Sequence, residues 1–104
     1  MYTVAETATF TKQANRYWNE EERSAFIEFI AHHPDAGEIV PGSGDVRKVR
    51  WAAKGKGKRG GVRVVYFNML DAGTIWLLLV YGKNVVENIP ANVLKQVKEV
   101  IEHD

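Results

Sequence analysis

The chain has 104 residues, of which 45% are hydrophobic and 11% aromatic, which suffices for one core and one globular domain over residues 1–104. A net charge of only +1 at pH 7 excludes a uniformly basic coat for nucleic acid. The absence of cysteine excludes disulfides, thiolate zinc sites and a cysteine nucleophile. The first residues lack the pattern of a signal peptide, and no apolar run approaches the roughly 20 residues of a membrane span, so we expect a cytoplasmic, non-membrane protein.

The first third of the chain predicts one strand and two helices. Residues 2–8 are short and rich in threonine and valine, which favours a strand. Aromatic and alanine side chains then recur at helical spacing and predict a helix from about Thr11: Phe10, Ala14, Tyr17 and Trp18. Asn19 is expected to cap a second helix that ends near Ala31, with Glu22 at the capping-box position.

Proline and glycine punctuate residues 34–45, which we expect to form a loop. Alternating and apolar patterns predict three antiparallel strands at residues 46–52, 62–68 and 74–81, the last of them buried on both faces. Residues 71–73, Asp-Ala-Gly, supply the turn between the last two strands. The predicted fold is therefore α+β, with a small antiparallel sheet of about four strands in the order β-α-α-β-β-β-α.

The last segment has the spacing of an amphipathic helix. Asn88 is expected to cap it, with Pro90 in its first turn. The predicted buried stripe consists of Leu94, Val97 and Ile101. The charged positions predicted to lie outside this stripe are Lys95, Lys98, Glu99 and Glu102.

Positive charge is concentrated in one segment. Residues 47–63 contain eight of the fourteen basic residues and no acid, and their centre, residues 54–61, reads Lys-Gly-Lys-Gly-Lys-Arg-Gly-Gly. Glycines allow the backbone to approach phosphates, and the cations neutralise them, so this segment predicts a site for a polyanion. The competing interpretation is a solvated hairpin connection, the usual role of charged loops.

Three segments of the second half resemble the RelE/HigB toxins of bacterial type II toxin–antitoxin systems, and the HigB branch most closely. They are residues 46–51 (Val-Arg-Lys-Val-Arg-Trp), residues 54–66 (the basic run followed by Val-Arg-Val-Val-Tyr) and residues 78–84 (Leu-Leu-Val-Tyr-Gly-Lys-Asn). The resemblance implies one RelE-like domain. The first 45 residues add topology and length to it but no diagnostic motif.

The resemblance also implies an activity and partners. Members of this family are ribosome-dependent endoribonucleases, or mRNA interferases, that inhibit translation. The ribose 2′-OH attacks the adjacent phosphate, leaving a 2′,3′-cyclic phosphate and a 5′-OH, and neither metal nor cofactor is needed. A cognate antitoxin neutralises the toxin, and in the HigB branch it usually carries a helix-turn-helix domain. We expect a monomer when the protein is free.

Site residues can be transferred one at a time. Lys48 and Arg50 match two basic residues that the family carries on one strand face, and Arg63 matches an arginine that holds the scissile phosphate. Asn84 stands where RelE-type members have an arginine, for which Lys83 substitutes in charge. No aromatic lies near Pro90, so Tyr81 or Tyr66 is expected to replace the family's tyrosine. The candidate catalytic set is Lys48, Arg50, Arg63, Tyr81 and Lys83. The candidate RNA-binding set is Lys54, Lys56, Lys58, Arg59 and Trp51.

Each candidate also has a plain structural interpretation. Lys48 and Arg50 would serve equally as the exposed side of an amphipathic strand, and Tyr81 ends an apolar strand in which burial is expected. Tyr66 lies three residues from Arg63, on the opposite side of the strand, which favours the core. Trp51 fits either the core or stacking on a base. The histidines show no ligand spacing, so we expect no metal site.

Two other functions fit the sequence. One is a ParE-like toxin that inhibits DNA gyrase by binding, and the other is a non-catalytic RNA-binding module. For a nuclease without a histidine at its site, the proton acceptor would be a lysine with a strongly lowered pKa or a tyrosine aided by nearby cations.

Overall fold

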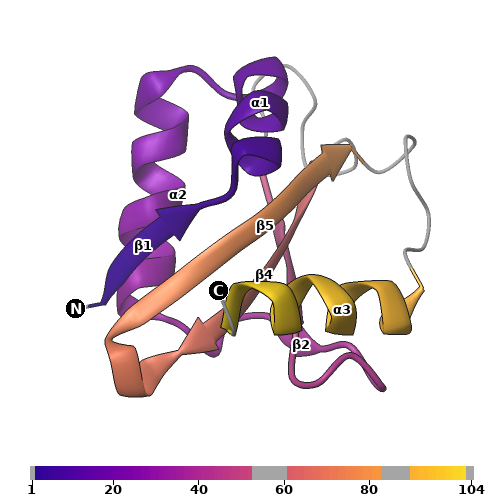
Figure 1. Cartoon of the computed structure of the whole chain (residues 1–104). Coiled ribbons are helices and arrows are strands. Elements are labelled where there is room, and N and C mark those ends of the chain that lie inside the picture. The colour runs from indigo at the N-terminus through magenta and orange to yellow at the C-terminus, as the bar shows by residue number, and fades with distance from the viewer. Residues whose placement is uncertain (1, 53–60, 83–89, 103–104) are drawn as a thin grey trace.

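The computed structural model describes residues 2–52, 61–82 and 90–102, which form an α+β fold (Figure 1), as the sequence predicts. The elements in chain order are β1 (Thr3–Glu6), α1 (Ala8–Tyr17), α2 (Glu20–His32), β2 (Glu38–Ile39), β3 (Arg47–Trp51), β4 (Val62–Met69), the short 3-10 helix η1 (Leu70–Ala72), β5 (Thr74–Gly82) and α3 (Ala91–Glu102). Within the described residues, no helix has the length and apolar character needed to cross a membrane.

The five strands form one sheet in the order β1-β5-β4-β3-β2. The sheet differs in two respects from the small antiparallel sheet of about four strands that the sequence predicts. First, β1 pairs in parallel with β5, so the sheet is mixed. The elements between these two strands supply the crossover connection that a parallel pair requires. Second, the predicted loop over residues 34–45 contains β2, in which Glu38 pairs with Lys48 and Ile39 pairs with Arg47.

A close backbone approach explains the extra strand. A Cβ atom on Gly37 would lie 2.9 Å from the carbonyl oxygen of Lys48. Only glycine therefore lets residues 36–38 come this near to β3. The chain reverses direction between β2 and β3 through Gly42, Gly44 and Asp45, all of which have positive φ.

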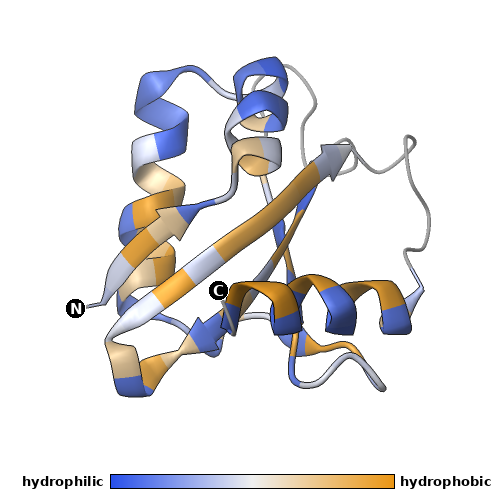
Figure 2. Cartoon of the chain, viewed as in Figure 1, coloured by the Kyte–Doolittle hydropathy of each residue, from blue (hydrophilic) through white to orange (hydrophobic). Residues whose placement is uncertain are grey.

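The sheet buries a different cluster on each side. The face covered by α1 and α2, called the α1/α2 face below, contributes to a core made of Phe10, Ala14, Trp18, Phe26, Ile30, Val62, Val64, Tyr66, Ile75, Leu77 and Val80. The opposite face, called the α3 face, contributes to a smaller cluster made of Val46, Val65, Phe67, Leu78, Tyr81 and Leu94. Figures 1 and 2 show α3 crossing the sheet on its own, away from α1 and α2, with hydrophobic residues along much of its length.

The helices of the α1/α2 face are fixed at their ends by polar contacts. The helix α1 begins at Ala8, about three residues earlier than predicted, because Thr7 caps it: its hydroxyl accepts a hydrogen bond from the Phe10 N–H at 3.0 Å and donates one to the Leu78 carbonyl at 2.8 Å. The predicted capping box of Asn19 and Glu22 is confirmed at the start of α2.

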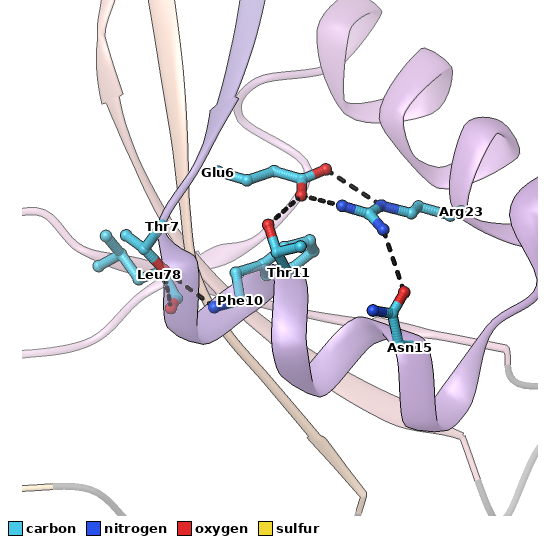
Figure 3. A network of polar contacts seen from close by, with 7 residues as sticks. All are labelled: Glu6, Thr7, Phe10, Thr11, Asn15, Arg23 and Leu78. Carbon is cyan, nitrogen blue, oxygen red and sulfur yellow. Dashed lines mark hydrogen bonds and ion pairs between the residues drawn. The ribbon is translucent and has the colours of Figure 1, made fainter.

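An ion pair joins β1 to α2, and a hydrogen bond joins it to α1 (Figure 3). The carboxylate of Glu6 pairs with the guanidinium of Arg23 on α2 and accepts a hydrogen bond from the Thr11 hydroxyl on α1 at 2.7 Å. Arg23 also donates to the Asn15 side chain at 3.4 Å. The three elements are thus held together at the edge of the sheet.

The helix α3 is rotated relative to the prediction. Leu94 is buried and Ile101 packs against the α3-face cluster, both as expected. Val97, by contrast, is 36% exposed and belongs to an outer side shared with Val93 and Val100. Lys98, predicted to lie outside, is half-buried instead: its Nζ donates to the Gly44 carbonyl and lies 5.8 Å from the centroid of the Phe67 ring. The aliphatic stem of a lysine covers apolar surface while its charge reaches a carbonyl, which explains how Lys98 takes an inner position. The predicted cap Asn88 lies outside the described residues.

Candidate functional site

Three candidate cations lie on the α3 face of adjacent strands. Lys48 and Arg50 are two residues apart on β3, and Arg50 is directly opposite Arg63 on β4. Arg63 is in turn directly opposite Tyr81 on β5. Because side chains at directly paired positions project from the same side of a sheet, the row Arg50, Arg63, Tyr81 crosses three strands on one face. Lys48 lies on the same face, in the neighbouring row of paired positions.

The pairing of Arg50 with Arg63 is electrostatically unfavourable. Side chains at paired positions start from Cβ atoms roughly 5 Å apart, where two like charges destabilise the sheet. Within the described residues, none of Lys48, Arg50 and Arg63 forms an ion pair with a carboxylate; the pairs found there are Glu6 with Arg23 and Glu102 with Lys98. The excess positive charge on this surface is typical of a binding site for an anion.

Two hollows adjoin the arginine pair. The larger, of about 540 Å³, is lined by Ala36, Glu38, Lys48, Val49, Arg50 and Arg63. The smaller, of about 350 Å³, is lined by Arg50, Trp51, Ala52, Gly61 and Arg63. Both volumes are in the range of roughly 300–1,000 Å³ that ligand sites occupy. Since Arg50 and Arg63 line both hollows, a phosphate bound between them would have room on either side for the rest of a nucleotide chain.

Tyr81 lies beside Arg63 but inside the protein. Only 4% of its surface is exposed, and it packs in the cluster beneath α3. Burial raises the pKa of the Tyr81 phenol, an effect that the positive charge of Arg63 partly opposes. The phenol therefore keeps its proton at neutral pH, and it lies against Arg63 as a neutral group.

Tyr66 has a structural position. It is fully buried on the α1/α2 face, as its spacing from Arg63 predicts. Its hydroxyl donates to the Pro34 carbonyl at 2.9 Å and accepts from the Gly37 N–H at 2.8 Å. Burial raises the pKa of this phenol too. Tyr66 thus fixes the segment before β2, and it lies on the opposite face of the sheet from the three cations.

Trp51 belongs mainly to the core. Its ring centroid is 5.3 Å from that of Phe26, with the planes at 74°, and 4.7 Å from that of Phe29. These contacts place the indole against α2, with part of its surface lining the smaller hollow. Packing between the sheet and α2 accounts for Trp51 without a stacked base.

The remaining candidates lie outside the described residues. They are Lys83 of the catalytic set and Lys54, Lys56, Lys58 and Arg59 of the RNA-binding set. The described site consists of the strand residues next to these segments in the sequence: Arg50 comes shortly before residues 53–60, and Arg63 shortly after them.

One polar residue of the larger hollow was not expected from the sequence. Glu38 lies on β2 directly opposite Lys48, so its side chain shares the face of the three cations. It escaped notice because residues 34–45 read as a loop. The sequence did contain a signal: Glu38, Ile39 and Val40 precede a Pro-Gly-Ser-Gly turn, and the Val40 N–H donates to the Val46 carbonyl across that turn at 2.8 Å.

Another hollow, also of about 540 Å³, differs in charge. Its lining includes the acids Asp45, Asp71 and Glu102 and a single cation, Arg47. The guanidinium of Arg47 donates to the Gly37 carbonyl at 2.6 Å and the Asp35 carbonyl at 3.3 Å, so its charge is already engaged with the backbone. This hollow is unsuited to a polyanion. In the described parts of the chain, no three His, Asp or Glu side chains are grouped so as to hold a metal ion.

No protein-family model matches this chain. The site is a cationic surface on a small α+β domain. It is centred on two opposed arginines, and a lysine and a carboxylate line the adjoining hollow.

Proposed function

We propose that this protein is a toxin of the RelE/HigB type, a ribosome-dependent endoribonuclease that cleaves mRNA and is neutralised by a cognate antitoxin, expected to be a helix-turn-helix protein. The observation that carries the proposal is the opposition of Arg50 and Arg63 beside Lys48, with no carboxylate in ion-pair contact among the described residues. A bound phosphodiester would relieve the repulsion that this arrangement creates.

In the proposed reaction the 2′ oxygen attacks the adjacent phosphorus and the bond to the 5′ oxygen breaks. Negative charge grows on the non-bridging oxygens as the pentacoordinate phosphorus forms. The planar fork of Arg63 donates two parallel hydrogen bonds to these oxygens, and Arg50 and Lys48 add positive charge from β3. Groups fixed on strands suit this role because they need no reorganisation as the charge develops.

Tyr81 is assigned a positioning role in this proposal. A side chain that is 4% exposed does not touch RNA on the surface of the sheet. From β5 it packs beside Arg63 and limits the directions in which the guanidinium can turn. Its raised pKa also argues against the phenolate as proton acceptor, because the deprotonated form is the one that burial disfavours. The loop cations Lys54, Lys56, Lys58 and Arg59, with Lys83, are proposed to hold messenger or ribosomal RNA around this centre.

The test is cleavage of translated mRNA. Primer extension after induction of the wild-type protein should show new 5′ ends inside open reading frames, and a 2′-deoxy substitution at the cleaved position should abolish cleavage on programmed ribosomes. Arg63→Ala should lower the cleavage rate on the order of 10²–10³-fold, as loss of one transition-state donor does. The matched control is Lys12→Ala, which removes an exposed cation on α1.

Two results would contradict the proposal. Growth arrest by the Arg63→Ala variant, accompanied by loss of gyrase supercoiling, would point to a ParE-like inhibitor. Steeply salt-dependent RNA binding with no new 5′ ends would point to a non-catalytic RNA-binding module. In either case Arg63→Ala should fold normally, with an unfolding free energy equal to or slightly above that of the wild type, since it removes a like-charge contact.

A further inference from the structure

The larger hollow of the site contains a single carboxylate among its lining residues. Glu38 is exposed on β2, directly opposite Lys48, and shares the hollow with Arg50 and Arg63. Within residues 2–52, 61–82 and 90–102, Glu38 forms no ion pair with these cations, whose neighbourhood would otherwise neutralise it. Its oxygens therefore remain available as hydrogen-bond and proton acceptors.

The sheet geometry places this carboxylate to one side of the arginine pair. Strands β2 and β4 are separated by β3, so Glu38 and Arg63 start about 10 Å apart across the sheet, twice the usual strand spacing. Glu38 also lies one same-face row along from the row of Arg50 and Arg63. A phosphate on the arginines and the ribose attached to it fit between these two positions, with the ribose nearer Glu38.

The segment that carries Glu38 is held firmly although β2 is short. The Tyr66 hydroxyl bonds to the Gly37 N–H at 2.8 Å, and the Arg47 guanidinium bonds to the Gly37 carbonyl at 2.6 Å. The Asn68 side chain donates to the Pro34 carbonyl at 2.8 Å. Both backbone groups of the residue before Glu38 are thus fixed by side chains of β3 and β4, which is the support that a reacting group requires.

We propose that Glu38 is the general base of the cleavage reaction, an inference that rests on the proposed function. The carboxylate takes the proton of the ribose 2′-OH, and the 2′ oxygen forms its bond to phosphorus. The bond from phosphorus to the 5′ oxygen breaks, and that oxygen leaves with a proton from solvent. The products are the 2′,3′-cyclic phosphate and the 5′-OH, and the proton on Glu38 is then released to water.

The tyrosines at the site and the histidines among the described residues fit this role less well. Tyr81 is buried beneath α3, and Tyr66 is buried on the other face of the sheet. His32 and His33 are at the end of α2 and line neither of the two hollows at the arginine pair. The charged groups that face Glu38 across the hollow are Lys48 and Arg50 from β3 and Arg63 from β4.

The experiment is single-turnover cleavage of mRNA on programmed ribosomes at neutral pH, with wild type, Glu38→Gln, Glu38→Asp, Arg63→Ala and the control Glu28→Gln, an exposed acid on α2. Glu38→Gln keeps the size of the side chain but cannot accept the proton, so it should lower the rate about 10²–10⁴-fold while binding programmed ribosomes as the wild type does. Glu38→Asp keeps the carboxylate and should cleave faster than Glu38→Gln. Arg63→Ala should also lower the rate, and Glu28→Gln should match the wild type.

The outcomes separate this inference from the function on which it rests. Cleavage by Glu38→Gln at the wild-type rate would overturn the assignment, and so would a Glu38→Asp variant no faster than Glu38→Gln, since Glu38 would then only orient Lys48. If the wild type cleaves, Glu38→Asp retains cleavage and Glu38→Gln does not, with unchanged thermal unfolding, the assignment holds. If the wild type leaves ribosome-bound mRNA intact, the proposed function fails and the role of Glu38 falls with it.

Discussion

The two faces of the sheet are built from alternate residues of the same strands and have opposite characters. On β4, Val62 and Val64 enter the core beneath α1 and α2, while Arg63 between them faces the other way. The α1/α2 face is closed by two helices, and its core includes stacked and edge-on aromatic rings. The α3 face is apolar only where α3 covers it, and its remainder carries Lys48, Arg50 and Arg63.

This difference shows how a chain of 104 residues keeps stability and a charged site apart. Three cations grouped on one surface oppose folding through their mutual repulsion. The compensating burial comes from the reverse side of the same strands, where Val62 and Val64, the neighbours of Arg63 on β4, are fully buried. Substitutions on the two faces should therefore affect different measurements.

The largest expected effect on stability comes from the closed face. Phe26 is fully buried and contacts both Trp18, at a ring-centroid distance of 5.2 Å, and Trp51, at 5.3 Å. Phe26→Ala should lower the free energy of unfolding by about 3–5 kcal/mol, because it leaves a cavity among rings that cannot collapse to fill it. Urea denaturation measures this loss.

The same variant sharpens the contrast with the cationic surface. Under conditions in which the protein is still folded, Phe26→Ala should bind and cleave RNA like the wild type, whereas Arg63→Ala should be stable and inactive. A Phe26→Ala variant that is folded but as inactive as Arg63→Ala would show that the two faces are coupled and that core stability and the charged site are not kept apart.

A smaller effect tests how α3 covers its face. Leu94→Ala should cost about 2–4 kcal/mol, because Leu94 is 3% exposed in the cluster with Phe67 and Tyr81. Val97→Ala should cost well under 1 kcal/mol, since Val97 is already 36% exposed. Thermal unfolding of the two variants under identical conditions gives the comparison. Equal losses would restore the helix orientation that the sequence pattern predicts and contradict the rotated one.

The sequence predicted those parts of the fold that local chemistry determines. The capping box of Asn19 and Glu22 is a local signal, and the alternation of β3 correctly placed Lys48 and Arg50 on one face. Strand β2 was missed because it has only two residues, and its existence depends on the approach of Gly37 to Lys48, eleven residues away in the chain. No local pattern reports such a contact.

The orientation of α3 illustrates the same limit. Its apolar positions span an arc wider than the surface they meet, and periodicity alone places the middle of that arc, near Val97, against the sheet. The contact of Lys98 with Phe67 and Gly44 turns the helix toward one edge of the arc. In the site, the pairing of Arg50 with Arg63 and the position of Glu38 both depend on the register between strands. A prediction from the sequence alone would have needed that register.

The loss of one buried hydroxyl links the two faces. Tyr66→Phe removes the hydroxyl that accepts from the Gly37 N–H, and a buried donor left without a partner costs about 1–3 kcal/mol. The Pro34 carbonyl keeps its bond from Asn68, which places the cost toward the lower end. Because the altered bond holds the residue before Glu38, the variant should also cleave more slowly if Glu38 takes the proton, while binding RNA as the wild type does.

The difference in unfolding free energy between the wild type and Tyr66→Phe depends on pH, because burial raises the pKa of Tyr66 in the wild type. The folded state holds the phenol proton more tightly than the unfolded chain does, so the stabilisation is fully present below about pH 10, the ordinary value, and is lost as pH rises through the higher folded pKa. The difference in unfolding free energy between wild type and Tyr66→Phe should be constant from neutral pH to about pH 9 and shrink above pH 10. Tyr81, whose pKa is also raised, is present in both proteins and cancels in that difference. A difference that grew with alkaline pH would mean that Tyr66 ionises more readily in the folded protein, contrary to its burial between α2 and the sheet.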